Sequence, residues 1–301
     1  MTTLEVVCAV EGAYTPHSAA MLHSVLANRG DADVRVHYLH DAAVPLEGDS
    51  ALAGMVERNG GSISFIPVDD ALVAGLPTVG FTGKATWYRI LLEDLLPEVD
   101  RALCLDADLI AADSLLPLWS TDLADSYLAA VTNVLDERYM RRPAELGLNP
   151  AQYFNAGVML MNLERMRADG CAAKLRAFAV EHADELVLRD QDALNYVLAG
   201  RRLPLHPRWN CMNAIFRFAW AVYAFTPAEI DEARRSPAIR HFEGPGINKP
   251  WNYQCPFPHR ELYARHRRET PWPTFKPEGR TVYRAARRQL GNLRRRLKRP
   301  G

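Results

Sequence analysis

Two carboxylates, Asp106 and Asp108, have the types and the spacing to do chemistry together. They flank Ala107 and follow the apolar run 102–105, which has the composition of a buried strand. Two carboxylates separated by one small residue at a strand end can both reach one hard cation. Mg²⁺ and Mn²⁺ prefer such oxygen ligands and complete their coordination with water and phosphate oxygens. The segment therefore predicts a divalent-metal site that holds a phosphorylated substrate.

The same pattern has a second interpretation. An apolar strand that ends in Asp-x-Asp is also the nucleophile motif of haloacid-dehalogenase-like phosphatases. Those proteins usually carry it on the first strand of the chain and follow it with Thr or Val two residues on. Here the motif follows about a hundred residues of other α/β sequence, and the partner segments described below fit a phosphatase poorly.

The elements that must position these carboxylates alternate between strands and helices. Strands are predicted at 4–10, 34–39, 62–67 and 102–105, and helices at 18–29, 49–59 and 86–96. This alternation predicts an α/β fold with a mostly parallel, Rossmann-like sheet and flanking helices. Ligands of such sheets bind beyond the carboxyl ends of the strands. The segments 9–11 and 106–108 should therefore line one crevice.

The second half of the chain predicts strands at 128–131, 157–162 and 239–242 and helices at 171–182 and 190–198. Residues 244–277 are rich in Pro and Gly and predict a loop. Neither an internal repeat nor a low-complexity linker divides the chain. We expect one domain over residues 1–277 and a separate basic tail over 278–301.

Four further segments lie in a fixed order around the Asp106–Asp108 pair. They are Thr86-Trp87-Tyr88-Arg89, Phe154-Asn155-Ala156-Gly157, Asp190-Gln191-Asp192 and His241-Phe242-Glu243-Gly244, the last followed by Lys249-Pro250-Trp251. The ordered set resembles glycosyltransferase family 8, which contains bacterial lipopolysaccharide galactosyl- and glucosyltransferases and glycogenin. The resemblance covers residues 4–255 and is carried by the order of the motifs rather than by any single one.

The resemblance implies a GT-A fold and a retaining transfer from a UDP-hexose to a glycan, glycolipid or other hydroxyl acceptor. It implies Asp106, Asp108 and His241 as ligands of Mn²⁺, with Mg²⁺ as the alternative ion. A neutral imidazole suits such a metal, although a lone His beside a strand is more often a core residue. The residues implied in nucleotide-sugar binding are Ala9, Val10, Glu11, Tyr14, Arg89, Asp106, Ala107, Asp108, Asn155, Ala156, Asp190, Gln191, Gly244 and Lys249.

This sequence departs from the family at two places. Glu11 stands where Asp is common, and Ala13 stands where Asn often occurs. We expect the acidic side chain to keep its contact with uracil and Tyr14 to stack on the ring, and we expect a ribose contact to be missing. Four residues separate Gly244 from Lys249 where the family often has two. Lys249 would place a point charge against the diphosphate, and the alternative for it is a solvated loop lysine.

Asp190 and Gln191 are the implied catalytic residues, near the anomeric carbon of the donor. A double displacement needs a carboxylate nucleophile on that face, and the amide of Gln191 is a poor one. We therefore expect front-face substitution, in which the departing phosphate oxygen takes the proton of the acceptor hydroxyl. Asp190 could equally be a helix N-cap, since an apolar helical segment follows it.

The overall composition restricts the partners and the compartment. The 301 residues include equal numbers of basic and acidic side chains, 36 each, so no binding to nucleic acid is expected. Five scattered cysteines, none in a CxxC pair, indicate neither a disulfide framework nor a zinc site. The chain begins with a strand-like run instead of a signal peptide and has no apolar stretch of membrane-spanning length. We expect a protein of the cytosol.

Two segments bear on the acceptor. Arg280–Arg299 carries nine basic and no acidic residues with an apolar stripe, which predicts an amphipathic helix. Such a helix either binds an anionic surface at the inner membrane face or packs on the domain. The aromatic segment Trp209–Phe225 is either core or a sugar-stacking platform. Two alternatives to transfer onto a separate acceptor are a glycogenin-like self-glucosylating primer and a catalytically inactive sugar-nucleotide binder.

Overall fold

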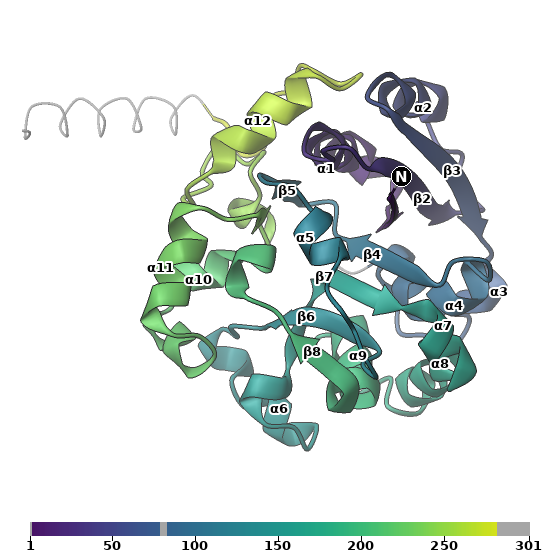
Figure 1. Ribbon diagram of the computed structural model, residues 1–301, viewed down its shortest axis with the longest axis vertical. Helices are drawn as coiled ribbons and strands as arrows, with labels where there is room; N and C mark the ends of the chain where they lie inside the picture. The colour runs from purple at the N-terminus through teal and green to yellow at the C-terminus, as the bar shows by residue number, and fades with distance from the viewer. Residues whose placement is uncertain (1, 79–82, 282–301) are drawn as a thin grey trace, which may run out of the picture.

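The computed structural model describes residues 2–78 and 83–281 (Figure 1). Its centre is a seven-stranded sheet with the order β3-β2-β1-β4-β7-β6-β8. A two-stranded sheet pairs β5 with β9. The strands are β1 Thr3–Ala9, β2 Asp33–Asp41, β3 Gly61–Val68, β4 Arg101–Leu105, β5 Leu109–Ala111, β6 Leu128–Thr132, β7 Phe154–Asn162, β8 Arg202–Pro204 and β9 Ile239–His241.

The predicted α/β architecture is confirmed. Strands β3, β2, β1 and β4 are parallel to one another, and β6 is parallel to β8. β7 is antiparallel to both of its neighbours, β4 and β6. The sheet is therefore mostly parallel and mixed in its second half.

Helices cover both faces of this sheet. The α-helices are α1 Thr15–Ala27, α2 Asp49–Arg58, α3 Asp70–Val73, α4 Leu92–Leu95, α5 Leu116–Trp119, α6 Arg142–Glu145, α7 Leu163–Ala168, α8 Cys171–Glu181, α9 Asp190–Leu198, α10 Asn213–Arg217, α11 Pro227–Arg235 and α12 Arg260–Arg268. The 3₁₀ turns are η1 Gly12–Tyr14, η2 Lys84–Leu91, η3 Glu137–Tyr139, η4 Pro150–Gln152, η5 Ala199–Arg201, η6 Pro207–Asn210, η7 Ala219–Tyr223 and η8 Gly246–Asn248.

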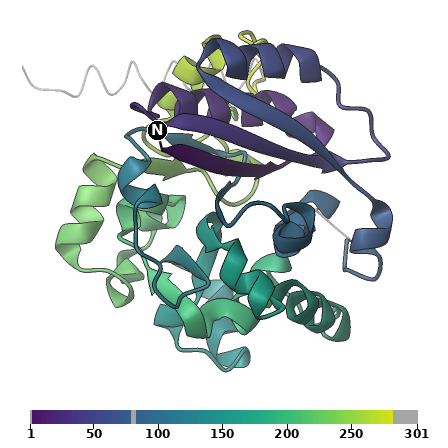
Figure 2. The same cartoon turned by 45° about the vertical axis from the view of Figure 1, so that its right-hand side comes forward.

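Alternation along the strands builds a core on each side of the sheet. In β7, Met159 and Met161 enter the cluster that contains α8 and α9, whereas Val158 and Leu160 enter the cluster on the opposite face. That second cluster takes the buried sides of α1 and α2, which lie over the N-terminal strands in Figure 2. Both faces are therefore dry, as a parallel sheet requires.

Two predicted elements were wrong. The helix expected at 86–96 is the 3₁₀ run η2 followed by the short α4. In η2 the residues Ala85 and Trp87–Leu91 are all buried, so packing on every side overrides the helical periodicity. The segment 244–277, predicted as loop, contains η8 and α12. α12 is mostly charged and buries few apolar side chains, chiefly Tyr263, so it lacks a periodic apolar signal.

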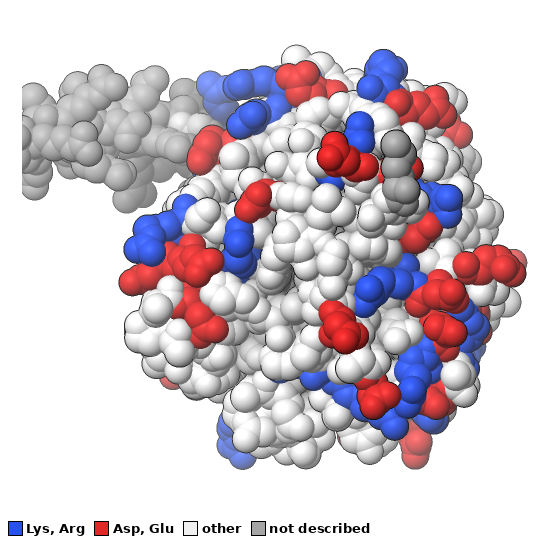
Figure 3. All heavy atoms as spheres, in the orientation of Figure 1, with Lys and Arg blue, Asp and Glu red and all other residues white. Residues whose placement is uncertain are grey.

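Several sequence-based expectations concern the surface and the tail. All five cysteines belong to described residues, where each is buried and none forms a disulfide. Within 2–78 and 83–281, no helix combines the length and apolarity needed to cross a membrane. Acidic and basic side chains are interspersed on the face in Figure 3. The predicted basic helix at 280–299 lies, apart from its first two residues, outside the described residues.

Candidate active site

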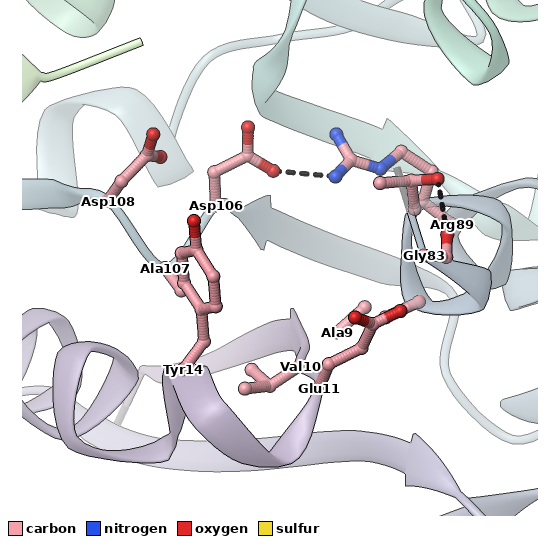
Figure 4. Close-up of a pocket in the computed structure, with 11 residues that line it drawn as sticks. Ala9, Val10, Glu11, Tyr14, Gly83, Arg89, Asp106, Ala107 and Asp108 are labelled. Carbon is pink, nitrogen blue, oxygen red and sulfur yellow. Dashed lines mark hydrogen bonds and ion pairs between the residues drawn. The ribbon is translucent and has the colours of Figure 1, made fainter. Parts of the chain in front are cut away.

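The site begins where two neighbouring parallel strands end. β1 pairs directly with β4, so Glu11 after β1 and Asp106 after β4 come to the same edge of the sheet. Figure 4 shows Tyr14 between them, with its hydroxyl directed toward the two aspartates. Tyr14 is 40% exposed. The crevice predicted from the strand order is present.

The Glu11 carboxylate lies where a side chain at position 83 would be, and Gly83 leaves this space empty. A Cβ added to Gly83 would lie 1.2 Å from Glu11 Oε1. The carboxylate thus lies against the backbone of the segment that leads into η2, at one end of the cavity in Figure 4.

His241 reaches the aspartates through a strand pair that is remote in sequence. β5 starts directly after Asp108, and its Leu109 is in register with His241 of β9. His241 Nε2 lies 3.2 Å from Asp108 Oδ1 and 3.8 Å from Asp106 Oδ2. One ligand atom from each of the three side chains falls within 4.8 Å of the others. Two carboxylates and an imidazole at these distances could together hold a divalent cation.

Asn210, which sequence reasoning missed, fixes the tautomer of His241. The Asn210 amide nitrogen donates to Asn155 Oδ1 at 2.8 Å, so its oxygen faces His241 Nδ1 at 2.9 Å. An amide oxygen only accepts, so Nδ1 carries a proton, and Nε2 is the ring nitrogen that faces the carboxylates. Orientation of a ligating imidazole by a second hydrogen bond is typical of metal sites. No local signal marks this role, because Asn210 lies in the turn η6.

Neighbouring charges shift the pKa values of Asp108 and His241 in opposite directions. Burial alone raises the pKa of Asp108, but the Lys249 ammonium and His241 outweigh it and hold that pKa well below its usual range. Burial lowers the pKa of His241, and the neighbouring carboxylates, Asp108 above all, more than reverse this. Opposite charges therefore lie close together at this site, with Asp108 and His241 buried.

Arg89 connects Asp106 with Asp190 across the site. Its guanidinium contacts Asp106 Oδ1 at 2.6 Å, Asp190 Oδ2 at 3.3 Å and the carbonyl of Ala156 at 2.8 Å. Burial raises the pKa of Asp190 to about 6, against the opposing effect of Arg89. Asp190 is the first residue of α9 and its N-cap is Arg189, so the alternative N-cap role for Asp190 is wrong.

Gln191 is held by groups at both ends of its amide. Its Oε1 accepts from the Ala156 amide at 3.1 Å and from Asn155 Nδ2 at 3.3 Å, and its Nε2 lies 3.3 Å from the Tyr153 hydroxyl. Asn155 is buried, and its Oδ1 accepts hydrogen bonds from the Gly157 amide and from Asn210 Nδ2.

The long loop still delivers Lys249 to the site. Gly244 has φ 91°, a left-handed conformation, and a Cβ there would approach Asn248 Nδ2 to 2.6 Å. The inserted residues form the single 3₁₀ turn η8, after which Lys249 pairs with Asp108 Oδ2. Lys249 is therefore an ion-paired side chain and not a solvated one.

All the sequence-predicted site residues line one of two adjoining cavities. The first is lined by Ala9, Val10, Glu11, Tyr14, Arg89, Asp106, Ala107 and Asp108. The second shares Arg89, Asp106 and Asp108 with it and adds Asn155, Ala156, Asp190, Gln191, His241, Gly244 and Lys249. Sequence reasoning missed the lining residues Gly83, Ala85 and Leu188, and it gave no site role to three lining residues within the quoted motifs, Thr86, Gly157 and Glu243.

The aromatic segment 209–225 lies apart from these cavities. Phe225 is buried in a separate apolar cluster, with Trp209, Phe216, Phe218 and Trp220 packed against it. The segment is thus largely core. Trp220 and Tyr223 also line another cavity, with Leu135 and Met140.

The family model of glycosyl transferase family 8 matches residues 5–255. The fold and the site define a GT-A glycosyltransferase, and the chain belongs to glycosyltransferase family 8. It is therefore an enzyme that transfers a sugar.

Solved and curated relatives agree with this assignment. A crystal structure of the galactosyltransferase LgtC with donor and acceptor sugar analogues is 28% identical, with a TM-score of 0.76, and the match covers 91% of this chain and 98% of that one. General stress protein A of Bacillus subtilis is 30% identical over 90% of this chain and 96% of its own length. A lipopolysaccharide 1,3-galactosyltransferase of Salmonella typhimurium is 25% identical over 68% of this chain and 60% of its own length.

Proposed function

We propose that the protein transfers glucose or galactose, with retention, from a UDP-hexose to a hydroxyl group of a glycan or glycolipid. One observation carries the proposal. The Asp106–Asp108–His241 triad lies where the two cavities meet, between a crevice at the ends of β1 and β4 and a pocket containing Gln191. A nucleotide in the first and a hexose in the second would place the diphosphate at the triad. The galactosyl- and glucosyltransferases among the relatives support a hexose.

A divalent cation fits the triad. A Cβ at Gly157 would lie 2.3 Å from His241 Cε1 and 2.8 Å from Asp106 Oδ2, so the glycine keeps this space clear of side-chain atoms. We propose Mn²⁺ as the ion, with Mg²⁺ as the alternative, held by Asp106, Asp108 and His241. When bound, it would neutralise the diphosphate and stabilise the leaving group.

The residues around the sugar pocket support a front-face mechanism. Asp190 is paired with Arg89 at 3.3 Å and the oxygen of Gln191 already accepts two hydrogen bonds, so neither is a free nucleophile. In the proposed step the bond from the anomeric carbon to the phosphate oxygen breaks, and the acceptor oxygen attacks from the same face. The acceptor proton passes to the departing phosphate oxygen. Asp190 and Gln191 orient and stabilise the cationic sugar.

The acceptor and the location belong to the same proposal. The cavity of about 380 Å³ lined by Trp220 and Tyr223 lies beside the segment after β6, because these side chains donate to the carbonyls of Leu135 and Asn133. Asn133 is bonded in turn to Tyr153 at the start of β7, near the sugar pocket. We propose that aromatic rings here contact the acceptor. We also propose that the enzyme is cytosolic and that its tail, 278–301, holds domain 1–277 at the inner membrane face.

Donor use is the direct test. The protein is incubated with UDP-, GDP- and dTDP-hexoses, with Mn²⁺, Mg²⁺ or EDTA, and thermal stability and nucleotide release are followed. We expect stabilisation and slow release of UDP only with a UDP-hexose and a divalent ion. Hydrolysis of phosphomonoesters without a response to UDP-hexoses would refute the proposal in favour of a phosphatase.

Two further measurements separate the remaining alternatives. Intact mass after incubation with donor should show no added hexose, since successive hexose additions would indicate a self-glucosylating primer. Binding of UDP-hexose without turnover in the presence of any hydroxyl acceptor or water would indicate an inactive binder. A covalent hexose adduct on Asp190 would refute front-face substitution.

A further inference from the structure

Tyr153 lies behind Gln191 and lines neither donor cavity. Its side chain is fully buried, and it precedes β7, which carries Asn155 and Ala156. Its hydroxyl has two partners, Gln191 Nε2 at 3.3 Å and Asp192 Oδ1 at 2.6 Å. Tyr153 therefore reaches the sugar pocket only through Gln191.

The direction of these hydrogen bonds follows from the chemistry of Asp192. A carboxylate is only an acceptor, so the Tyr153 hydroxyl donates its one proton to Asp192. Burial, and then the Asp192 charge, raise the pKa of Tyr153 well above its usual range, so the phenol keeps that proton. The hydroxyl oxygen then has only lone pairs to offer Gln191. Gln191 must present its NH₂ group to Tyr153, and its oxygen faces Ala156.

Asp192 is itself fixed by two other donors. Arg142 Nε lies 3.0 Å from Asp192 Oδ2, and the amide of Leu188 donates to the same oxygen at 2.8 Å. Asp192 is fully buried and Arg142 is 8% exposed, so water does not compete for these bonds. The second bond also spans the turn before α9, where Arg189 has the unusual φ of 54°. Arg142 thus holds Asp192 in place, Asp192 accepts the Tyr153 proton, and the Tyr153 oxygen accepts from Gln191.

We propose that Tyr153, held by the Asp192–Arg142 ion pair, is a positioning residue that selects one orientation of the Gln191 amide. The alternative orientation, turned by half a revolution, would direct NH₂ at the Ala156 amide proton and the oxygen at a hydroxyl without a free proton. The selected orientation also uses the lone pairs of the Gln191 oxygen for Ala156 and Asn155. The pocket therefore keeps one fixed dipole toward the sugar. The catalytic consequence rests on the function proposed above.

The experiment is a double-mutant cycle on donor hydrolysis, in which water is the acceptor. Tyr153→Phe should lower kcat about tenfold, the effect of losing one hydrogen bond, and leave the Kd of UDP unchanged. In a Gln191→Ala background the same change should alter kcat by less than about twofold, because Tyr153 then has no amide to orient. An equal loss in both backgrounds, or a loss of UDP binding, would overturn the proposal in favour of a general structural role.

Tyr127→Phe is the matched control. The Tyr127 hydroxyl also donates to a carboxylate, Asp169 Oδ2 at 2.8 Å, but neither residue lines the two donor cavities. Because Asp169 is partly exposed, this variant should lose no more stability than Tyr153→Phe, and it should keep its kcat. A kcat loss as large in Tyr127→Phe as in Tyr153→Phe would overturn the proposal.

A second readout does not depend on turnover. In protein labelled with ¹⁵N-glutamine, the side-chain amide signal that is lost in Gln191→Ala belongs to Gln191. That signal should shift or broaden in Tyr153→Phe and stay in place in Tyr127→Phe, and an unchanged signal would overturn the positioning role. If the wild-type protein neither bound UDP nor hydrolysed the donor, the proposed function would fail, while this spectrum would still test the orientation of Gln191.

Discussion

A methyl group at Gly157 should weaken the proposed metal site without unfolding the protein. The Cβ of Gly157→Ala would lie 2.3 Å from His241 Cε1 and 2.9 Å from Nδ1, about 1 Å short of ordinary contact with the first atom. The imidazole has no room to retreat, since it is 2% exposed and bonded to Asn210 at 2.9 Å. Either the ring or β7 must therefore shift.

The size of that shift decides the outcome. Overpacking of this kind costs about 1–3 kcal/mol, which a domain with about 5–15 kcal/mol of stability tolerates. Metal–ligand distances tolerate only about 0.2 Å, so a shift of about 1 Å should remove His241 from the donor set. We expect the affinity for Mn²⁺ in the presence of UDP to fall roughly 10- to 100-fold, with donor hydrolysis falling in parallel.

Calorimetric titration of Mn²⁺ into the protein–UDP mixture measures this directly. Gly200→Ala is the control, because an added Cβ there meets no heavy atom within 4 Å. Thermal unfolding of both variants checks that the fold persists. Wild-type Mn²⁺ affinity in Gly157→Ala, or an equal loss in Gly200→Ala, would refute the steric reasoning.

Three other changes test separate parts of the structure. Lys249→Gln should raise the Kd of UDP about tenfold and leave that of uridine unchanged, since the ammonium acts on phosphate; an equal loss for uridine would contradict this role. Burial and Arg267 lower the pKa of His17 from 6.5 to about 3, so the folded state excludes a proton that the unfolded chain binds, and stability falls as pH drops below 6.5. His17→Phe keeps a ring against Trp251. Between pH 7 and pH 5 its free energy of unfolding, measured with urea, should fall by about 2 kcal/mol less than that of the wild type. An equal fall in both proteins would exclude His17 as the source. Thr226→Ala breaks a capping box and should lower stability by about 1 kcal/mol, whereas Thr226→Ser should restore it.

Local pattern was sufficient for the strands of the central sheet except the three-residue β8, which was not predicted. Apolar runs of strand length, each bounded by turn residues, located β1 to β4, and their spacing implied parallel neighbours. The same reasoning failed for η2, where the whole segment is buried, and for α12, whose packing surface is mostly polar. Periodicity reports one buried face, and neither element has the simple apolar face that it detects.

The sequence by itself determined which chemistry the Asp106–Asp108 pair could do, since a strand end with two carboxylates presents hard oxygen ligands in any context. It also placed Glu11 and Asp106 at one sheet edge, because parallel strands end on the same side. Only the tertiary structure brought His241 to the pair, through the register of β9 against β5. No signal in the sequence marked Asn210, which contacts His241, or Tyr153, which contacts Gln191. Their roles depend on hydrogen-bond directions between segments far apart in the chain, and no local pattern of residue types encodes such directions.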